Sequence, residues 1–230
     1  MSETPVVMIS SMATKEVLRE LLAQYQALSG TAVQVHSAGG VDVAKRVRGG
    51  EAFDIVVLAR DAIDRLVRED YLLGDSCTDL VRSGISVAVR AGAPHPDIGS
   101  EEALRQAVLD APSLSYSTGP SGAYLVGLFQ SWGIYESIRE RIVQPPPGVP
   151  VGSLVARGEV SLGFQQLSEL LHLPGIDVLG PLPAQIQSIT VFSGAVTASS
   201  RHVGTVRALL AFMASPAAAG AIQRQGMEPA

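Results

Sequence analysis

The chain has 230 residues, of which 47% are hydrophobic and 17% charged, and its formal net charge is −5. This composition predicts a globular protein with a sizeable core and excludes a disordered chain. The sequence has no basic run, which argues against a nucleic-acid-binding protein. Its single cysteine, Cys77, excludes an internal disulfide and a thiolate metal centre. No apolar run reaches the length of a membrane span, so we expect no direct membrane insertion.

The first third of the chain predicts strands and helices in alternation. Apolar runs at residues 6–9, 32–35 and 53–58 are typical of strands, and helices begin near Thr14, Asp42 and Asp61. The third run is apolar almost throughout, as in a parallel sheet covered on both faces. With such short connections, the pattern predicts an open, doubly wound α/β sheet.

The middle and end of the chain continue this alternation. Strands are predicted at residues 85–89, 113–117, 160–164, 176–179 and 189–198. Helices are predicted after Ser100, from about Ser121, and at residues 202–213 and 215–225. At Gly119-Pro120-Ser121-Gly122 a strand turns into a helix, with Ser121 as the expected cap, and the helix dipole there favours a small anion. A capped helix with nothing bound accounts for this stretch equally well.

Four predicted strand ends carry small hydroxyl, glycine or amide residues. They are Ser10-Ser11, residues 37–40, residues 117–122, and Gln165-Gln166. In doubly wound sheets ligands bind where strand ends meet, so these four segments predict one binding region. Ordinary turn chemistry is the alternative explanation, since serine and glycine are common in turns that bind nothing.

Four stretches of the sequence resemble a known family. They are Val7-Met8-Ile9-Ser10-Ser11-Met12-Ala13-Thr14, Gly49-Gly50-Glu51-Ala52-Phe53-Asp54-Ile55-Val56, Gly119-Pro120-Ser121-Gly122-Ala123-Tyr124 and Gly158-Glu159-Val160-Ser161-Leu162-Gly163. They resemble the molybdate-binding members of the type II periplasmic binding proteins, from about residue 6 to the C-terminus. The resemblance implies a substrate-binding protein of the ABC transporter family, with two lobes, a two-strand hinge and a ligand clamped between the lobes. Each lobe would be a doubly wound mixed sheet with flanking helices.

The resemblance also sets the expected domain boundaries. The hinge strands are expected near residues 83–86 and 182–189. Lobe 1 then comprises residues 1–83 and 189–230, and lobe 2 comprises residues 84–188.

Three positions depart from the family's oxyanion-binding pattern. The family's serine before the first helix falls at Met12, its serine-rich turn at Ala38-Gly39-Gly40, and its tyrosine after the Leu-Gly strand at Gln166. Glutamine both donates and accepts hydrogen bonds, whereas a bare tetrahedral dianion needs donors only. These departures shift the expected ligand from molybdate toward an organic acid.

We therefore expect a solute-binding protein that clamps a small anion, either an oxyanion or an organic polycarboxylate. Arg82 and Arg60 are both candidates for a carboxylate clamp, and Arg82 is the better of the two, although a surface arginine explains either residue equally well. The expected ligand-binding residues are Ser10, Ser11, Met12, Gly39, Gly40, Arg82, Ser117, Thr118, Ser121, Gly122, Gln165 and Gln166.

Two alternatives stay open at this stage. A branch of the same fold resembles aconitate isomerase, which moves a double bond in a tricarboxylate and needs a group that removes and returns a proton. His36 is the catalytic candidate in that case, although a strand-end histidine that faces water explains the residue too. The other alternative is the effector-binding module of a regulator.

No cofactor and no metal are expected, and the expected partner is a small anionic ligand rather than a nucleic acid. The sequence as written begins without an export signal, which predicts a cytoplasmic protein. If Met1 stands where a signal sequence was removed, the expectation changes to a periplasmic protein with a possible membrane transporter partner.

Overall fold

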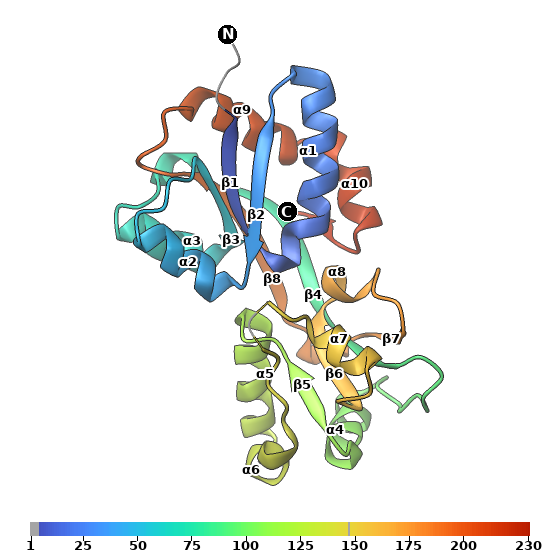
Figure 1. Cartoon of the computed structure of the whole chain (residues 1–230). Helices are drawn as coiled ribbons and strands as arrows, with labels where there is room; N and C mark the ends of the chain where they lie inside the picture. The colour runs from blue at the N-terminus through green and yellow to red at the C-terminus, as the bar shows by residue number, and fades with distance from the viewer. Residues whose placement is uncertain (1–4, 147) are drawn as a thin grey trace. The chain divides into compact units, whose positions relative to one another are not determined.

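The computed structural model describes residues 5–146 and 148–230 and divides into two compact units. Unit 1 comprises residues 1–83 and 191–230, and unit 2 comprises residues 84–190. Two strands, β4 (Thr78–Arg90) and β8 (Ile189–Val196), run from one unit into the other (Figure 1).

The sheet of unit 1 is parallel at its centre. Strand β1 (Val6–Ser11) lies between β2 (Val33–Ala38) and β3 (Ile55–Ala59) and pairs in parallel with both. The next strand, β8, is antiparallel to β3, and the C-terminal β9 (Glu228–Pro229) pairs with β4. Because β1, β2 and β3 are parallel, their carboxyl ends lie at one edge of the sheet.

Helices cover both faces of this sheet (Figure 1). Alternate residues of β1 supply the two cores, since Met8 faces the cluster built with α1 and α9, and Ile9 faces the cluster built with α2 and α3. The helices of unit 1 are η1 (Met12–Thr14), α1 (Lys15–Ser29), α2 (Gly40–Arg48), α3 (Arg60–Arg68), η2 (Gly74–Ser76), α9 (Val203–Met213), η5 (Pro216–Ala218) and α10 (Ala219–Arg224).

Unit 2 has a mixed sheet. Strands β5 (Leu114–Tyr116) and β6 (Leu162–Gln166) are parallel, and β4 is antiparallel both to β6 and to β7 (Ile176–Pro181). Phe129 and Phe164 meet edge to face in its main core. Its helices are α4 (Glu101–Asp110), α5 (Pro120–Ser131), α6 (Tyr135–Ile138), η3 (Arg139–Arg141), α7 (Val151–Ala156), α8 (Leu167–Leu170) and η4 (Ala184–Ile186).

The predicted α/β alternation is confirmed, and three local predictions are wrong. Strand β4 begins at Thr78 rather than at residue 85. The first half of the strand was not predicted because exposed Asp79 and Arg82 interrupt its apolar pattern. Helix α1 has no side-chain cap from Thr14; instead, the Ser11 hydroxyl caps η1 just before it. Helix α5 begins at Pro120, so Ser121 lies inside it and is not its cap.

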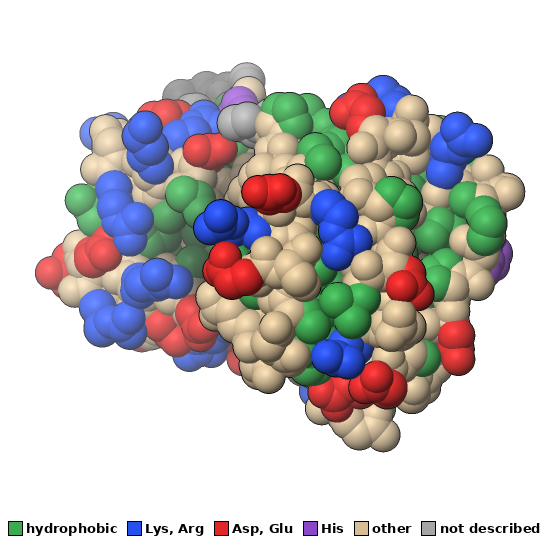
Figure 2. All heavy atoms as spheres, turned by 90° about the horizontal axis from the view of Figure 1, so that it is seen from below, with side chains coloured by type: hydrophobic (Ala, Val, Ile, Leu, Met, Phe, Trp, Pro, Cys, Tyr) green, Lys and Arg blue, Asp and Glu red, His purple; other side chains and the backbone are tan. Residues whose placement is uncertain are grey.

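Basic and acidic side chains are interspersed on the face of the molecule drawn in Figure 2. That face therefore presents no broad positive field. Within residues 5–146 and 148–230, no single helix is both long and apolar enough to span a membrane. One pair of helices reaches that length and composition only when taken together, and the pair is bent by 61°: Val203–Met213 and Pro216–Arg224.

Candidate functional site

The carboxyl edge of β1 and β2 carries a pair of hydroxyl groups. The register sets Ser10 opposite Ser37, and their Oγ atoms lie 2.9 Å apart. Both side chains lie on the sheet face that α1 covers, because Met8 and Val35, two residues earlier on each strand, contact that core. Ser10 is fully buried and Ser37 is half-buried, so each hydroxyl is the hydrogen-bond partner of the other.

Two helical segments begin at the same edge. The Ser11 Oγ accepts a hydrogen bond from the Ala13 N–H at 3.4 Å, and Met12 opens η1 half-buried. Gly39 precedes α2, which has nine residues and no side-chain cap on its first turn. The unit 1 edge therefore brings together Ser10, Ser11, Met12, Gly39 and Gly40, in an arrangement where backbone N–H groups can donate to an anion.

The structure places His36 on the opposite face of β2 from Ser37. Its ring centroid lies 6.2 Å from that of Phe53, edge to face, and Phe53 belongs to the core under α2 and α3. His36 is half-buried there. It is therefore not grouped with the serine pair, and its predicted catalytic role stays a prediction.

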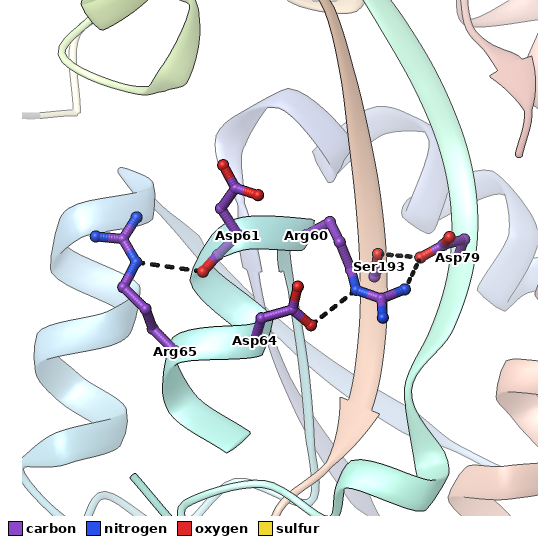
Figure 3. Close-up of polar contacts among 6 residues, drawn as sticks. All are labelled: Arg60, Asp61, Asp64, Arg65, Asp79 and Ser193. Atoms are coloured by element: carbon purple, nitrogen blue, oxygen red, sulfur yellow. Dashed lines mark hydrogen bonds and ion pairs between the residues drawn. The ribbon is translucent and has the colours of Figure 1, made fainter. Parts of the chain in front are cut away.

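The guanidinium group of Arg60 forms ion pairs with two carboxylates of the protein (Figure 3). Its Nε donates to Asp64 Oδ1 and one terminal nitrogen donates to Asp79 Oδ1, both at 2.8 Å. The hydrogen bonds to Asp64 and Asp79 raise the pKa of Arg60. Burial alone would raise the pKa of Asp79, but a 2.6 Å hydrogen bond from Ser193 and the Arg60 pair outweigh it and lower that pKa. This network ties α3 to β4 and β8 within unit 1.

Arg82, the expected carboxylate clamp, is an exposed residue of β4. It lies beside the C-terminal strand, where its Nε donates to the Pro229 carbonyl at 3.3 Å. The remaining guanidinium nitrogens have no hydrogen bond or ion pair within the described residues. Its role in binding stays a prediction.

In unit 2 the turn from β5 to α5 is built tightly. The Ser117 and Ser121 Oγ atoms lie 2.8 Å apart, and Ser121 is buried. Gly122 packs so closely on this turn that a Cβ atom would overlap the Ser117 carbonyl oxygen. Thr118 is exposed on the turn, and Gly119 is the N-cap of α5. The predicted strand, turn and helix are therefore present, with a hydroxyl pair inside the turn.

The two glutamines lie at the neighbouring strand end. Because Tyr116 pairs with Phe164, Gln165 lies alongside Ser117 one residue further on. Gln165 Oε1 accepts from the Gly152 N–H at 3.3 Å and its Nε2 donates to Glu169 Oε1 at 2.8 Å. Gln166 Nε2 donates to Thr190 Oγ1 at 3.0 Å. Both amides are thus fixed in orientation by partners within unit 2.

Glu169 was missed by the sequence analysis. It lies in the short helix α8, which follows β6, and burial raises the pKa of its carboxyl group to about 7. The sequence offered one signal, the four-residue spacing from Gln165. Among the described residues, including those around Glu169, no cluster of three or more His, Cys, Asp or Glu residues could hold a metal ion.

Comparisons with known proteins agree with this architecture. The family model of the bacterial extracellular solute-binding proteins matches residues 6–228. The aconitate isomerase of a Pseudomonas species is 38% identical over 232 residues, covering 98% of this chain and 88% of that protein.

Two solved structures are similar in fold. The periplasmic molybdate-binding protein of Azotobacter vinelandii superposes with a TM-score of 0.80 at 19% identity, covering 96% of this chain and 98% of the other. The sulfate-binding protein of Mycobacterium tuberculosis superposes with a TM-score of 0.77 at 16% identity, covering 99% and 87%. The predicted resemblance to molybdate-binding proteins is confirmed at the level of the fold. The chain has the type II periplasmic-binding-protein fold and belongs to the bacterial extracellular solute-binding protein family.

Proposed function

We propose that this chain binds an unsaturated organic tricarboxylate and moves its carbon–carbon double bond, as an isomerase built on a solute-binding fold. The observation that carries the proposal is the 38% identity to an aconitate isomerase across 98% of the chain. Similarity of that extent covers both units, including the strand ends described above.

The unit 1 edge supports the binding of carboxylates. Ser10 and Ser37 supply hydroxyl groups, and the first turn of α2 supplies backbone N–H groups near Gly39 and Gly40. A carboxylate accepts hydrogen bonds from both kinds of donor, and the positive end of the helix dipole favours its charge. No cofactor is required for these contacts.

The unit 2 edge supports an organic acid over a bare oxyanion. Gln165 and Gln166 contribute amides, and Glu169 contributes a carboxyl group with a pKa near neutrality. Such groups accept as well as donate hydrogen bonds, which suits a ligand that carries C–H, carboxyl and carboxylate groups together.

The proposed reaction is a proton transfer. A base removes a proton from the methylene carbon beside the double bond, and an acid returns a proton to the far carbon of that double bond. The protein must therefore position the substrate and supply one group that titrates near pH 7.

The test is to incubate the purified protein with trans-aconitate and follow the ultraviolet absorbance of the conjugated acid. We expect conversion to the cis isomer, confirmed by chromatography of the products. If no double-bond shift appears with a panel of unsaturated di- and tricarboxylates, the isomerase proposal is wrong. Replacing His36 with alanine, with His95→Ala as the control at an exposed histidine, tests the catalytic role predicted for His36.

A second candidate is a binding component without chemistry, acting with a membrane transporter. The family match and the likeness in fold to molybdate- and sulfate-binding proteins favour it. Calorimetric titration with molybdate, sulfate, citrate and trans-aconitate separates the two candidates. Tight binding of an inorganic oxyanion without any double-bond shift would favour this second candidate.

A further inference from the structure

Glu169 is a half-buried residue of unit 2 whose carboxyl group is held by an amide. Its Oε1 accepts a hydrogen bond from Gln165 Nε2 at 2.8 Å. The other end of that amide is fixed, because Gln165 Oε1 accepts from the backbone N–H of Gly152 at 3.3 Å. Gln165 therefore presents an N–H to Glu169, and the carboxyl group has a defined orientation.

Other carboxyl groups of this unit have different surroundings. Glu159, for example, is exposed and paired with Arg157, and Asp177 is bonded to His95 and to the Gly92 N–H. Glu169 has no such ion pair within the described residues. Glu169 is half-buried, and a carboxyl group shielded from solvent without a cation beside it is costly to ionise.

The surroundings of α8 contain few other titratable groups. The helix packs against β6 and β7, and the titratable residue of β7 is Asp177, which is engaged by His95. His172 follows the helix and is exposed. Burial raises the pKa of Glu169 to about 7, against the opposing effect of the Gln165 hydrogen bond, and a pKa near the working pH suits a group that both removes and returns a proton.

This carboxyl group lies next to the strand ends where the ligand is proposed to bind. Gln165 lies alongside Ser117, at the start of the turn into α5, and α5 is twelve residues long with no side-chain cap. Gln165 and its partner Glu169 thus follow the carboxyl end of β6, beside the carboxyl end of β5 from which the Ser117 turn leaves.

We propose that Glu169 is the proton-transfer group of the isomerisation and that Gln165 positions it, an inference that rests on the proposed function. The Glu169 carboxylate removes a proton from the methylene carbon of the tricarboxylate, and the C–H electron pair becomes the new π bond to the central carbon. The electrons of the old π bond then take the same proton from Glu169 at the far carbon. The proton that leaves is the proton that returns, so no oxidant or reductant is needed. The two reacting carbons are separated by one carbon, so a single carboxyl group can serve both.

The first test uses Glu169→Gln, which keeps the shape of the side chain and removes its proton chemistry. We expect turnover of trans-aconitate to fall about 10²–10⁴-fold, the usual contribution of a general acid or base. Binding of tricarballylate, a saturated analogue that cannot isomerise, should stay within a few-fold of wild type. Glu159→Gln, at an exposed carboxylate of the same unit, is the control and should behave as wild type in both assays.

The second test needs no variant to be active. A bound trianion raises the pKa of a nearby carboxyl group, so tricarballylate binding to wild type near pH 7 should take up protons. Calorimetry in two buffers of different ionisation enthalpy measures that uptake. Glu169→Gln should abolish it, and Glu159→Gln should not.

The outcomes separate the two proposals. If wild type neither binds tricarballylate nor isomerises trans-aconitate, the proposed function fails, and the role of Glu169 fails with it. If wild type isomerises trans-aconitate but Glu169→Gln keeps its turnover and its proton uptake, only the role of Glu169 is overturned. If Glu169→Gln does not fold, the wild-type proton uptake still decides, because a wild type that binds without taking up protons near pH 7 contradicts the inference.

Discussion

The turn from β5 into α5 gives a sharp prediction, because two glycines of the same helix have opposite surroundings. A Cβ atom on Gly122, the third residue of α5, would overlap the Ser117 carbonyl oxygen and come within 3.1 Å of the Tyr116 ring. A Cβ atom on Gly127, in the middle of α5, would meet no atom within 4 Å. Alanine should therefore be accepted at Gly127 and rejected at Gly122.

The expected magnitudes follow from two opposing effects. Replacing an exposed helical glycine with alanine stabilises the helix by about 1 kcal/mol, so Gly127→Ala should raise the free energy of unfolding by that amount. Gly122→Ala has the same gain but also overpacks the turn, at a cost of about 3 kcal/mol, since the obstacle is backbone. The net loss is about 2 kcal/mol, and the gap between the variants is about 3 kcal/mol.

Differential scanning calorimetry of the two variants and wild type measures this gap. For a chain of this size, it corresponds to roughly 6–12 °C in Tm. We also expect Gly122→Ala to weaken trans-aconitate binding, since the displaced turn carries the Ser117 and Ser121 hydroxyls. Equal stability of the two variants would refute the close packing of Gly122 on Ser117.

Three further predictions concern single side chains. Ser37→Ala should lower the free energy of unfolding by about 1–3 kcal/mol, because the buried Ser10 hydroxyl loses its partner, and the double alanine variant should cost less than the sum in urea titrations. The raised pKa of Glu169 means that the folded state keeps a proton that the unfolded state has lost, so wild-type stability should fall as pH rises from about 4.5 to about 7. Thermal melts of Glu169→Gln should show a flatter profile over that range, and an unchanged profile would contradict the shift. Arg82→Ala should weaken trans-aconitate binding about tenfold, the value of one charge-assisted hydrogen bond, and an unchanged calorimetric titration would remove Arg82 from the site.

Much of the fold could be predicted from the sequence because buried strands and helices show recognisable patterns of apolar residues. Strand β3 is buried along its whole length, and its five residues are all apolar, so its position is evident without any structure. The first half of β4 was missed for the converse reason. Exposed Asp79 and Arg82 are typical of a loop in the sequence, and only the pairing of β4 with β9 shows that they belong to a strand.

The candidate site was harder to predict, because its chemistry depends on contacts between distant segments. The sequence indicates Ser10 and Ser37 as turn residues, but only strand register shows that they face each other. Arg60 is a plausible clamp in the sequence, yet Asp79, nineteen residues later, occupies its guanidinium. Glu169 resembles any acidic residue in a first helical turn, since its burial comes from tertiary packing that local sequence does not encode.

The residues at the carboxyl ends of the unit 2 strands bear on which ligand we propose for this chain. A tetrahedral dianion is bound by donors alone and has no proton chemistry for a carboxyl group to serve. In unit 2, Glu169 lies one hydrogen bond from Gln165, and Gln165 lies alongside the Ser117 turn. The proposed isomerisation makes use of that arrangement, since a carboxyl group with a pKa near 7 can both remove a proton and return it. Under the proposed function, we therefore expect Gln165 and Glu169 to favour an organic acid that exchanges a proton over an inorganic oxyanion.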